Sequence, residues 1–450
     1  MRNSFKQLAG KYKLLKQGWS PQQNLFYGFL TYIFVGFVLL SLPFMQKESA
    51  SFLDHLFIST SAVSTTGLVT ISIFDTYNFF GQFIIMTLIQ LGGIGYLSFT
   101  TFMLLSTTRK MTFWHKKILS TEFTLPKTIK INDFLKSVIL FTLIMETLGA
   151  ILFFIAFKMD GMPTTEALWS SVFHSVSTFC TAGFSLYNDS FMGYIDNGFI
   201  NAIISMLAIC GSLGFIVITD FGMVIRNKAH KISFTTKIIL YGFVTLLTIG
   251  TAFFYFAEPT IAQLEDSRFL AAFFQAMTAM TTVGFNTVDF GLFSQAMILI
   301  CVFLMYVGAS PSGTAGGIKI TTLTAVFSIM KSRLRGNKQI TFLGRVIPYE
   351  RLYIATSAFI FYTLLIFIGT FLITITHVSE LKDILFEVAS ALGTVGISRG
   401  ITGDLTVFGK WVIIILMFIG RLGVLTFGLA IWSKTITEEE REVLKEDIAV

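Results

Sequence analysis

Four apolar stretches of this 450-residue chain are too short to cross a lipid bilayer. They cover residues 51–64, 166–180, 267–281 and 380–393. Each has about 14 residues and would extend roughly 20 Å as a helix, whereas the hydrocarbon core is roughly 30 Å thick. A Gly-containing turn follows or ends each stretch, at Gly67, Gly183, Gly284 and Gly396. Non-helical backbone at membrane depth is tolerated only inside protein or beside water. We therefore predict four re-entrant half-helices whose turns meet around a polar path.

Longer apolar runs surround these stretches. Hydrophobic residues make up 54% of the chain and charged residues only 13%, whereas about a quarter of a soluble domain is charged. Runs of about 20 apolar residues predict a multi-pass membrane protein with eight spans. The spans lie near residues 24–44, 79–107, 134–157, 197–226, 237–257, 293–330, 350–377 and 408–433.

The distribution of charged residues between the loops predicts how the chain is oriented in the membrane. Lys and Arg gather in residues 1–16, 109–130, 226–237 and 331–345, whereas most acids lie in the opposite loops. The positive-inside rule therefore puts the basic loops and both termini in the cytoplasm of a cell membrane, and the half-helices enter from outside. In this setting the basic excess indicates topology, and no nucleic-acid partner is expected.

The order span, short stretch, glycine turn, span occurs four times in the same orientation. The expected fold is all-α, with four such repeats in pseudo-fourfold arrangement around one pore. The expected divisions are a basic N-terminus (1–23), repeats 1 to 4 (24–108, 134–226, 227–330 and 350–433), linkers (109–133 and 331–349) and an acidic tail (434–450).

The glycine turns indicate a cation site. Rings of backbone carbonyls can replace the hydration shell of K⁺, and glycine admits the required backbone without a Cβ clash. The half-helices also point their negative C-terminal ends at the turns. The sequence contains no recognisable catalytic or metal-ligand set, and Cys180, Cys210 and Cys301 predict neither disulfides nor zinc. We expect no enzyme activity and no cofactor in this chain, with K⁺ as the transported ion.

These residues resemble the Trk/Ktr/HKT superfamily of potassium transporters. The resemblance covers about residues 20–433 and lies in "STSAVSTTGL", "HSVSTFCTAGFSL", "TTVGFNTVDFG", "GTVGI", "GASPSGTAGGIKITT" and "MFIGRLGVLTF". Eight spans without an attached cytosolic domain look like the bacterial Ktr membrane subunit. Some plant relatives that conduct Na⁺ have Ser at the first filter glycine, so Gly67 points to K⁺. Cys180 and Thr181 stand where relatives often have two Asn.

The resemblance implies a selectivity filter of four short segments. Its residues are Ser64, Thr65, Thr66 and Gly67; Cys180, Thr181, Ala182 and Gly183; Thr281, Thr282, Val283 and Gly284; and Gly393, Thr394, Val395 and Gly396. It also implies a homodimer, sodium activation, and a separate octameric cytosolic ring of RCK-type subunits that binds ATP or ADP. The tail after residue 433 is either solvated or a docking element for that ring.

A second feature interrupts the sixth predicted span. Glycines and Pro311 oppose a continuous helix there, so the segment is either a packed kink or, as the resemblance implies, an intramembrane gate. The gate residues are Gly308, Ala309, Ser310, Pro311, Ser312, Gly313, Thr314, Ala315, Gly316 and Gly317, with Lys319 and Arg421. Cations at membrane depth are costly and usually functional or paired, although Arg421 could instead extend to the interface.

Two further polar residues have open roles. Glu146, in the middle of the third span, is expected to pair with a base or with backbone donors. His174 precedes the second glycine turn, and packing with hydrogen bonding is favoured over ion contact. An Na⁺- or H⁺-coupled carrier remains the alternative function, although such carriers usually have inverted repeats.

Overall fold

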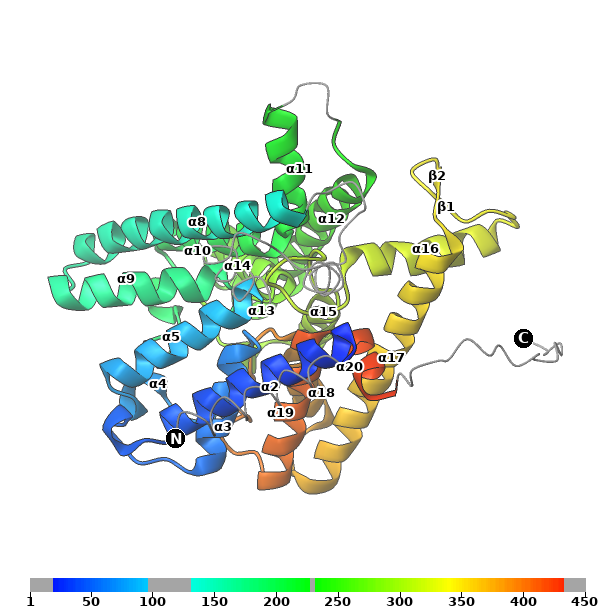
Figure 1. Cartoon of the computed structure of the whole chain (residues 1–450). Coiled ribbons are helices and arrows are strands. Elements are labelled where there is room, and N and C mark those ends of the chain that lie inside the picture. Colours follow the sequence, from blue (N-terminus) through cyan, green and yellow to red (C-terminus); the bar gives the residue numbers. More distant parts are fainter. Residues whose placement is uncertain (1–18, 96–130, 227–230, 433–450) are drawn as a thin grey trace.

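The computed structural model describes residues 19–95, 131–226 and 231–432, and these are almost entirely helical (Figure 1). Four helices coincide with the half-length stretches predicted from the sequence: α3 Phe52–Val63, α9 Thr164–Phe179, α14 Arg268–Thr281 and α18 Leu381–Gly393. A longer helix precedes and packs against each one, at α2 Pro21–Leu40, α8 Ile131–Met159, α12 Phe234–Ala257 and α17 Tyr349–Thr376. Local capping supports these boundaries, since Ser20 and Ser51 accept hydrogen bonds from the first turns of α2 and α3.

A second set of helices follows the half-helices. These are α5 Phe79–Ile94, α10 Gly198–Leu213 with α11 Phe215–Arg226, α15 Gln295–Tyr306 with α16 Ile320–Leu334, and α19 Val407–Leu422 with α20 Val424–Trp432. Short elements complete the described chain: α4 Ile73–Thr76, α13 Pro259–Ala262, the 3-10 turns Pro43–Met45, Met192–Tyr194 and Phe290–Leu292, and the antiparallel strands β1 Thr341–Phe342 and β2 Arg345–Val346.

Two spans that we predicted as continuous are broken, which corrects the sequence interpretation. Between α10 and α11 the chain bends by 89°, and between α19 and α20 it bends by 100°. The bends occur at Gly214 and Gly423, whose φ angles of +83° and +85° lie in the left-handed region that ends helices. Helix α5 likewise stops before Gly95, at φ +91°. Hydropathy alone does not report these backbone breaks.

The number of clear spans changes accordingly. Among the described residues, four helices are long and apolar enough to cross a membrane, or six if each bent pair counts as one. The remaining predicted spans are the one at 79–107, described only to residue 95, and the one at 293–330, which a loop interrupts. The expected basic N-terminus, the first cytoplasmic linker and the acidic tail lie largely or wholly outside the described residues.

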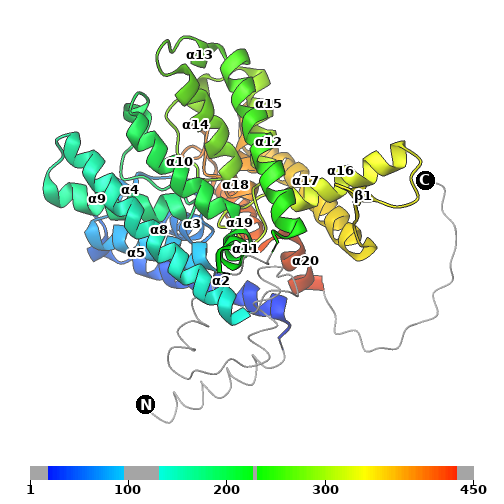
Figure 2. The same cartoon turned by 90° about the horizontal axis from the view of Figure 1, so that it is seen from above.

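The helices form four groups, each with a long helix, a half-helix and a second helix (Figure 2). The second helix of each group packs against the half-helix of the next: α5 on α9, α10 on α14, α15 on α18, and finally α19 on α3. This cyclic packing buries the C-terminal ends of the half-helices at the centre. Large apolar side chains such as Phe34, Phe256 and Phe367 remain exposed on the long helices, as expected of a surface in contact with lipid.

Candidate functional site

The four glycine turns share one backbone conformation. Each has a threonine with positive φ, two residues before a glycine with positive φ. The threonine φ angles are 52°, 49°, 57° and 49° at Thr65, Thr181, Thr282 and Thr394. The glycine φ angles are 92°, 66°, 85° and 88° at Gly67, Gly183, Gly284 and Gly396. A β-branched residue at positive φ is an outlier that the surrounding structure must maintain, so its fourfold recurrence marks a specialised site.

The four glycines are packed in cyclic order. A Cβ placed on each one would overlap the carbonyl oxygen that precedes the glycine of the next segment, at Ala182, Val283, Val395 and Thr66 in turn. A Cβ on Gly396 would also lie 3.0 Å from the Cα of Gly67. The contacts therefore close on themselves, and we name segments 64–67, 180–183, 281–284 and 393–396 the glycine ring. No side chain fits at these four positions without moving a neighbouring carbonyl.

Hydroxyl residues that sequence reasoning missed hold the ring in place. They stand six residues before each ring glycine, at Ser61, Ser177, Thr278 and Ser390. Their carbonyl oxygens accept from the N–H groups of the residues before the glycines, at 2.8–3.3 Å. Their hydroxyls accept from Gly67 and Gly396 N–H, both at 3.1 Å, or donate to the carbonyls of Phe184 and Phe285 at 2.8 and 2.6 Å. The spacing was visible in the sequence as a repeated hydroxyl position.

The interrupted sixth span contains a compact loop, residues 307–319, between α15 and α16. The alternative of a simple helical kink is therefore wrong. Ile318 N–H donates to Tyr306 O at 2.9 Å and Ile320 N–H to Ala309 O at 3.0 Å, so the two ends of the loop lie close together. A Cβ on Gly308 would overlap Gly316 O, which explains the need for glycine there.

This loop lies against the threonines of the glycine ring. The Thr181 hydroxyl donates to the Thr314 hydroxyl at 3.0 Å, and Gly316 N–H donates to the Thr282 hydroxyl at 3.2 Å. A Cβ on Gly316 would also overlap the Thr394 hydroxyl. The loop therefore contacts three of the four ring segments.

Further main-chain bonds attach the loop to the second helix group. Ser310 N–H donates to Ser212 O at 3.2 Å, and Phe215 N–H donates to Ser312 O at 3.2 Å. Ile216 N–H donates to the Ser312 hydroxyl at 3.1 Å. The bend at Gly214 therefore accommodates the loop, because a Cβ on Gly214 would lie 2.8 Å from Pro311 O.

Two cations donate to carbonyls of the loop: Lys319, at the C-terminal end of the loop itself, and Arg421 of α19. Lys319 Nζ donates to the carbonyls of Ala315 and Gly316 at 2.6 and 2.8 Å. Arg421 donates to Thr314 O at 2.6 Å and to Gly93 O at 3.1 Å, and also reaches Gly92 O. Arg421 therefore binds main chain inside the protein and does not extend to the interface. A cavity of about 200 Å³ adjoins both cations and the loop.

The other two polar residues pack behind the ring. Glu146 accepts from the side-chain amide of Gln90 at 3.1 Å and from the thiol of Cys180 at 3.8 Å, so its described partners are an amide and a thiol instead of the expected base or backbone donor. His174 lies 2.8 Å from Ser170 O through Nδ1, and its Nε2 accepts from Leu186 N–H at 3.2 Å. Its ring stacks on Tyr187 at 4.9 Å between centroids. This arrangement agrees with the packing role expected from the sequence.

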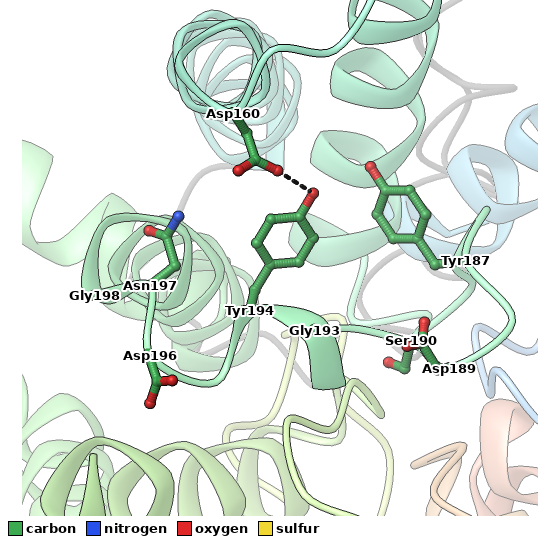
Figure 3. A pocket seen from close by; sticks show the side chains of 9 residues that line it. All are labelled: Asp160, Tyr187, Asp189, Ser190, Gly193, Tyr194, Asp196, Asn197 and Gly198. Carbon is green, nitrogen blue, oxygen red and sulfur yellow. Dashed lines mark hydrogen bonds between the residues drawn. The ribbon is translucent and has the colours of Figure 1, made fainter. Parts of the chain in front are cut away.

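A separate open cavity of about 740 Å³ is acidic (Figure 3). Its lining residues are Asp160, Tyr187, Asp189, Ser190, Gly193, Tyr194, Asp196, Asn197 and Gly198. The Tyr194 hydroxyl donates to Asp160 at 3.1 Å, and burial raises the pKa of that phenol above its ordinary value, so it stays neutral. The described residues contain no group of three or more His, Cys, Asp or Glu that could hold a metal ion. The carboxylates that line this cavity can attract cations through their negative charge.

Comparisons with known proteins agree with this architecture. Residues 30–435 match the TrkH family, described as cation transport protein. The Ktr system potassium uptake protein B of Bacillus subtilis is 34% identical over 414 residues, which is 91% of this chain and 92% of the relative. The potassium/sodium uptake protein NtpJ of Enterococcus hirae is 34% identical over 433 residues, covering 94% of this chain and 95% of the relative.

A solved structure shares the fold. The potassium transporter TrkH from Vibrio parahaemolyticus matches with a TM-score of 0.70 and 23% identity, over 90% of this chain and 84% of that chain. The resemblance inferred from the glycine motifs is thus confirmed, as is the expectation that the protein is not an enzyme. This chain is a multi-pass membrane protein that belongs to the TrkH family of cation transport proteins.

Proposed function

We propose that this protein is the channel-like, ion-translocating subunit of a potassium uptake system. The cyclic contact of the four ring glycines carries the proposal. Backbone carbonyls held around one axis can take the place of the hydration shell of K⁺, and the proposed filter consists of the glycine ring. Hydroxyl bracing of the segments supports a fixed carbonyl geometry, which is one way in which a filter can discriminate between K⁺ and the smaller Na⁺.

Loop 307–319 is proposed as the gate of this pathway. Its contacts with Thr181, Thr282 and Thr394 put main chain against one side of the ring. Lys319 and Arg421 add positive charge at the same place and would oppose passage of a cation while the loop is seated. The two cations also hold the carbonyls of the loop, so a seated loop has most of its polar groups satisfied.

The proposed organisation follows the cyclic packing of the four helix groups. Each group would be one span–half-helix–span repeat, with the boundaries expected from the sequence and with both termini in the cytoplasm. The bound regulator would be a cytosolic RCK-type ring that responds to ATP and ADP, and two copies of this chain would form a homodimer. The word "system" in the name of the Bacillus subtilis relative supports a separate partner component.

The dependence of K⁺ flux on Na⁺ distinguishes the proposed channel from a coupled carrier. The name of the Enterococcus relative includes both potassium and sodium uptake, so activation by Na⁺ or coupling to Na⁺ must be distinguished. In proteoliposomes with a clamped K⁺ gradient, a channel should pass K⁺ down the gradient without Na⁺, and Na⁺ should change only the rate. Flux that is absent without Na⁺, or that moves K⁺ against its gradient when Na⁺ runs down its own, would support the carrier.

A further inference from the structure

Thr314 has every polar group in a hydrogen bond. Its N–H donates to Gly211 O at 3.1 Å, and its carbonyl accepts from Arg421 at 2.6 Å. Its hydroxyl donates to Phe179 O at 3.3 Å and accepts from the Thr181 hydroxyl at 3.0 Å. The side chain is fully buried. One loop residue therefore joins the second half-helix, the second helix group and a cation of the fourth group.

The bond between Thr181 and Thr314 is unlike the loop's other contacts with the ring. Thr282 accepts a bond from the main chain of Gly316, so any loop residue with an N–H could make it. The hydroxyls of Thr65 and Thr394 are fully buried and have no hydrogen-bond partner among the described residues. Within the part of the chain that the structure describes, Thr181 is the only one of the four positive-φ threonines that bonds a loop side chain.

Thr181 lies next to the contact between two ring segments. Thr181 has a positive φ of 49°, a conformation that depends on its surroundings. The next residue is Ala182, whose carbonyl oxygen lies against Gly67 of the neighbouring segment. Loss of the hydrogen bond between the Thr181 and Thr314 hydroxyls would therefore alter the spacing between segments 180–183 and 64–67.

We propose that Thr314 is a latch that couples the position of loop 307–319 to the geometry of ring segment 180–183 through the Thr181 hydroxyl. Withdrawal of the loop breaks this bond and releases Thr181, so opening of the gate and ion selectivity change together. Arg421 acts as a positioning residue, because it donates a hydrogen bond to the carbonyl of Thr314. The inference deepens the proposed function and rests on the loop being the gate.

A double-mutant cycle between Thr181→Val and Thr314→Val tests the latch. Valine keeps the shape of threonine, and each single variant leaves the remaining hydroxyl another acceptor, Cys180 O at 2.8 Å or Phe179 O at 3.3 Å. The first readout is reactivity of Ala315→Cys with a charged methanethiosulfonate reagent in detergent solution. Ala315 is buried and adjoins the 200 Å³ cavity, so reactivity reports loop withdrawal. Cys210→Ala removes the half-buried native thiol.

We expect each single variant to raise the reaction rate about fivefold, as for loss of one net hydrogen bond, and the double variant to be no faster than the faster single one. The Rb⁺/Na⁺ flux ratio in proteoliposomes should fall in parallel, and Thr314→Ser should restore both values. Thr65→Val is the matched control, because it removes an equivalent hydroxyl that makes no hydrogen bond to the loop. Thr65→Val alone should leave the rate of the thiol reaction unchanged, and adding it to Thr314→Val should leave the rate of that single variant unchanged.

Independent effects in the double variant, or a Thr65→Val effect as large as that of Thr181→Val, would overturn the latch. A failure of Thr314→Ser to restore the wild-type values would also contradict it. The thiol reaction needs no transport, so it remains informative if the chain does not conduct K⁺. In that case the proposed function fails in the flux measurement while the hydroxyl coupling is tested separately.

Discussion

Replacement of Gly67 by serine tests whether the glycine ring selects the ion. Gly67 has a φ of +92°, and a Cβ there would overlap Ala182 O and lie 3.2 Å from the Cα of Gly183. The serine must therefore either strain its own backbone or displace a ring carbonyl. Left-handed backbone costs a non-glycine residue about 1–2 kcal/mol, and the carbonyl displacement adds to this cost.

The expected consequence is a loss of discrimination with retained permeation. If about 2 kcal/mol of ring distortion falls on the K⁺-bound state and not on the Na⁺-bound state, the K⁺/Na⁺ permeability ratio drops about 30-fold. The assay is the reversal potential under bi-ionic conditions in a planar bilayer, or competition of K⁺ and Na⁺ with Rb⁺ flux into proteoliposomes. Gly284→Ser should behave alike, because a Cβ at Gly284 overlaps Val395 O.

Gly161→Ser separates backbone strain from ring geometry. Gly161 has a φ of +83°, but a Cβ there would meet nothing within 4 Å. This variant should lose a similar amount of backbone stability in thermal unfolding and keep the wild-type permeability ratio. Permeability ratios that stay at the wild-type value in both Gly67→Ser and Gly284→Ser, in folded protein, would refute the carbonyl-filter reasoning.

Three further outcomes are expected. Arg421→Ala removes a donor to the carbonyl of Thr314, so basal K⁺ flux should rise several-fold; lower flux in folded protein would make the loop a required binding element. The partly buried ion pair between Lys410 and Asp54, 2.7 Å apart, joins the first and fourth helix groups. Lys410→Met should therefore lower the free energy of unfolding by roughly 1–2 kcal/mol, between the values typical of exposed and of buried pairs, and the Asp54→Asn double variant should recover part of it; an additive double loss would contradict the pairing. Deletion of residues 436–450 should weaken an ATP-dependent flux response if the tail docks the regulator, and an unchanged response would assign docking to the basic loops.

Local sequence signals predicted the parts of the site that depend on residue type. Gly67, Gly183, Gly284 and Gly396 stood out because each follows or ends an apolar stretch of half-membrane length. The interruption near Pro311 was visible because proline and glycine oppose a helix in an otherwise apolar run. Each of these signals lies within a short stretch of consecutive residues, so predicting it required no information about contacts between distant parts of the chain.

Features that depend on backbone angles or on distant contacts were beyond reach. Gly214 and Gly423 lie in largely apolar runs, and hydropathy does not distinguish a glycine inside a helix from one at φ +83° or +85°. The bond between Thr181 and Thr314 joins residues far apart in the chain. The hydroxyls before the ring glycines, such as Ser390, were visible but had no assigned role, because serine is common at the ends of apolar helices.

The second helices of the four groups differ in how they are interrupted. In the first, second and fourth groups, the second helix ends at a single glycine of positive φ, at Gly95, Gly214 and Gly423. In the third group, residues 307–319 stand at the corresponding interruption. At Gly214 and Gly423 the chain changes direction across a single glycine. The longer interruption in the third group instead forms a loop that contacts the positive-φ threonines of three ring segments. If loop 307–319 is the proposed gate, its asymmetry arises from a longer interruption in one of the four helix groups, which leaves the repeated turns of the ring unchanged.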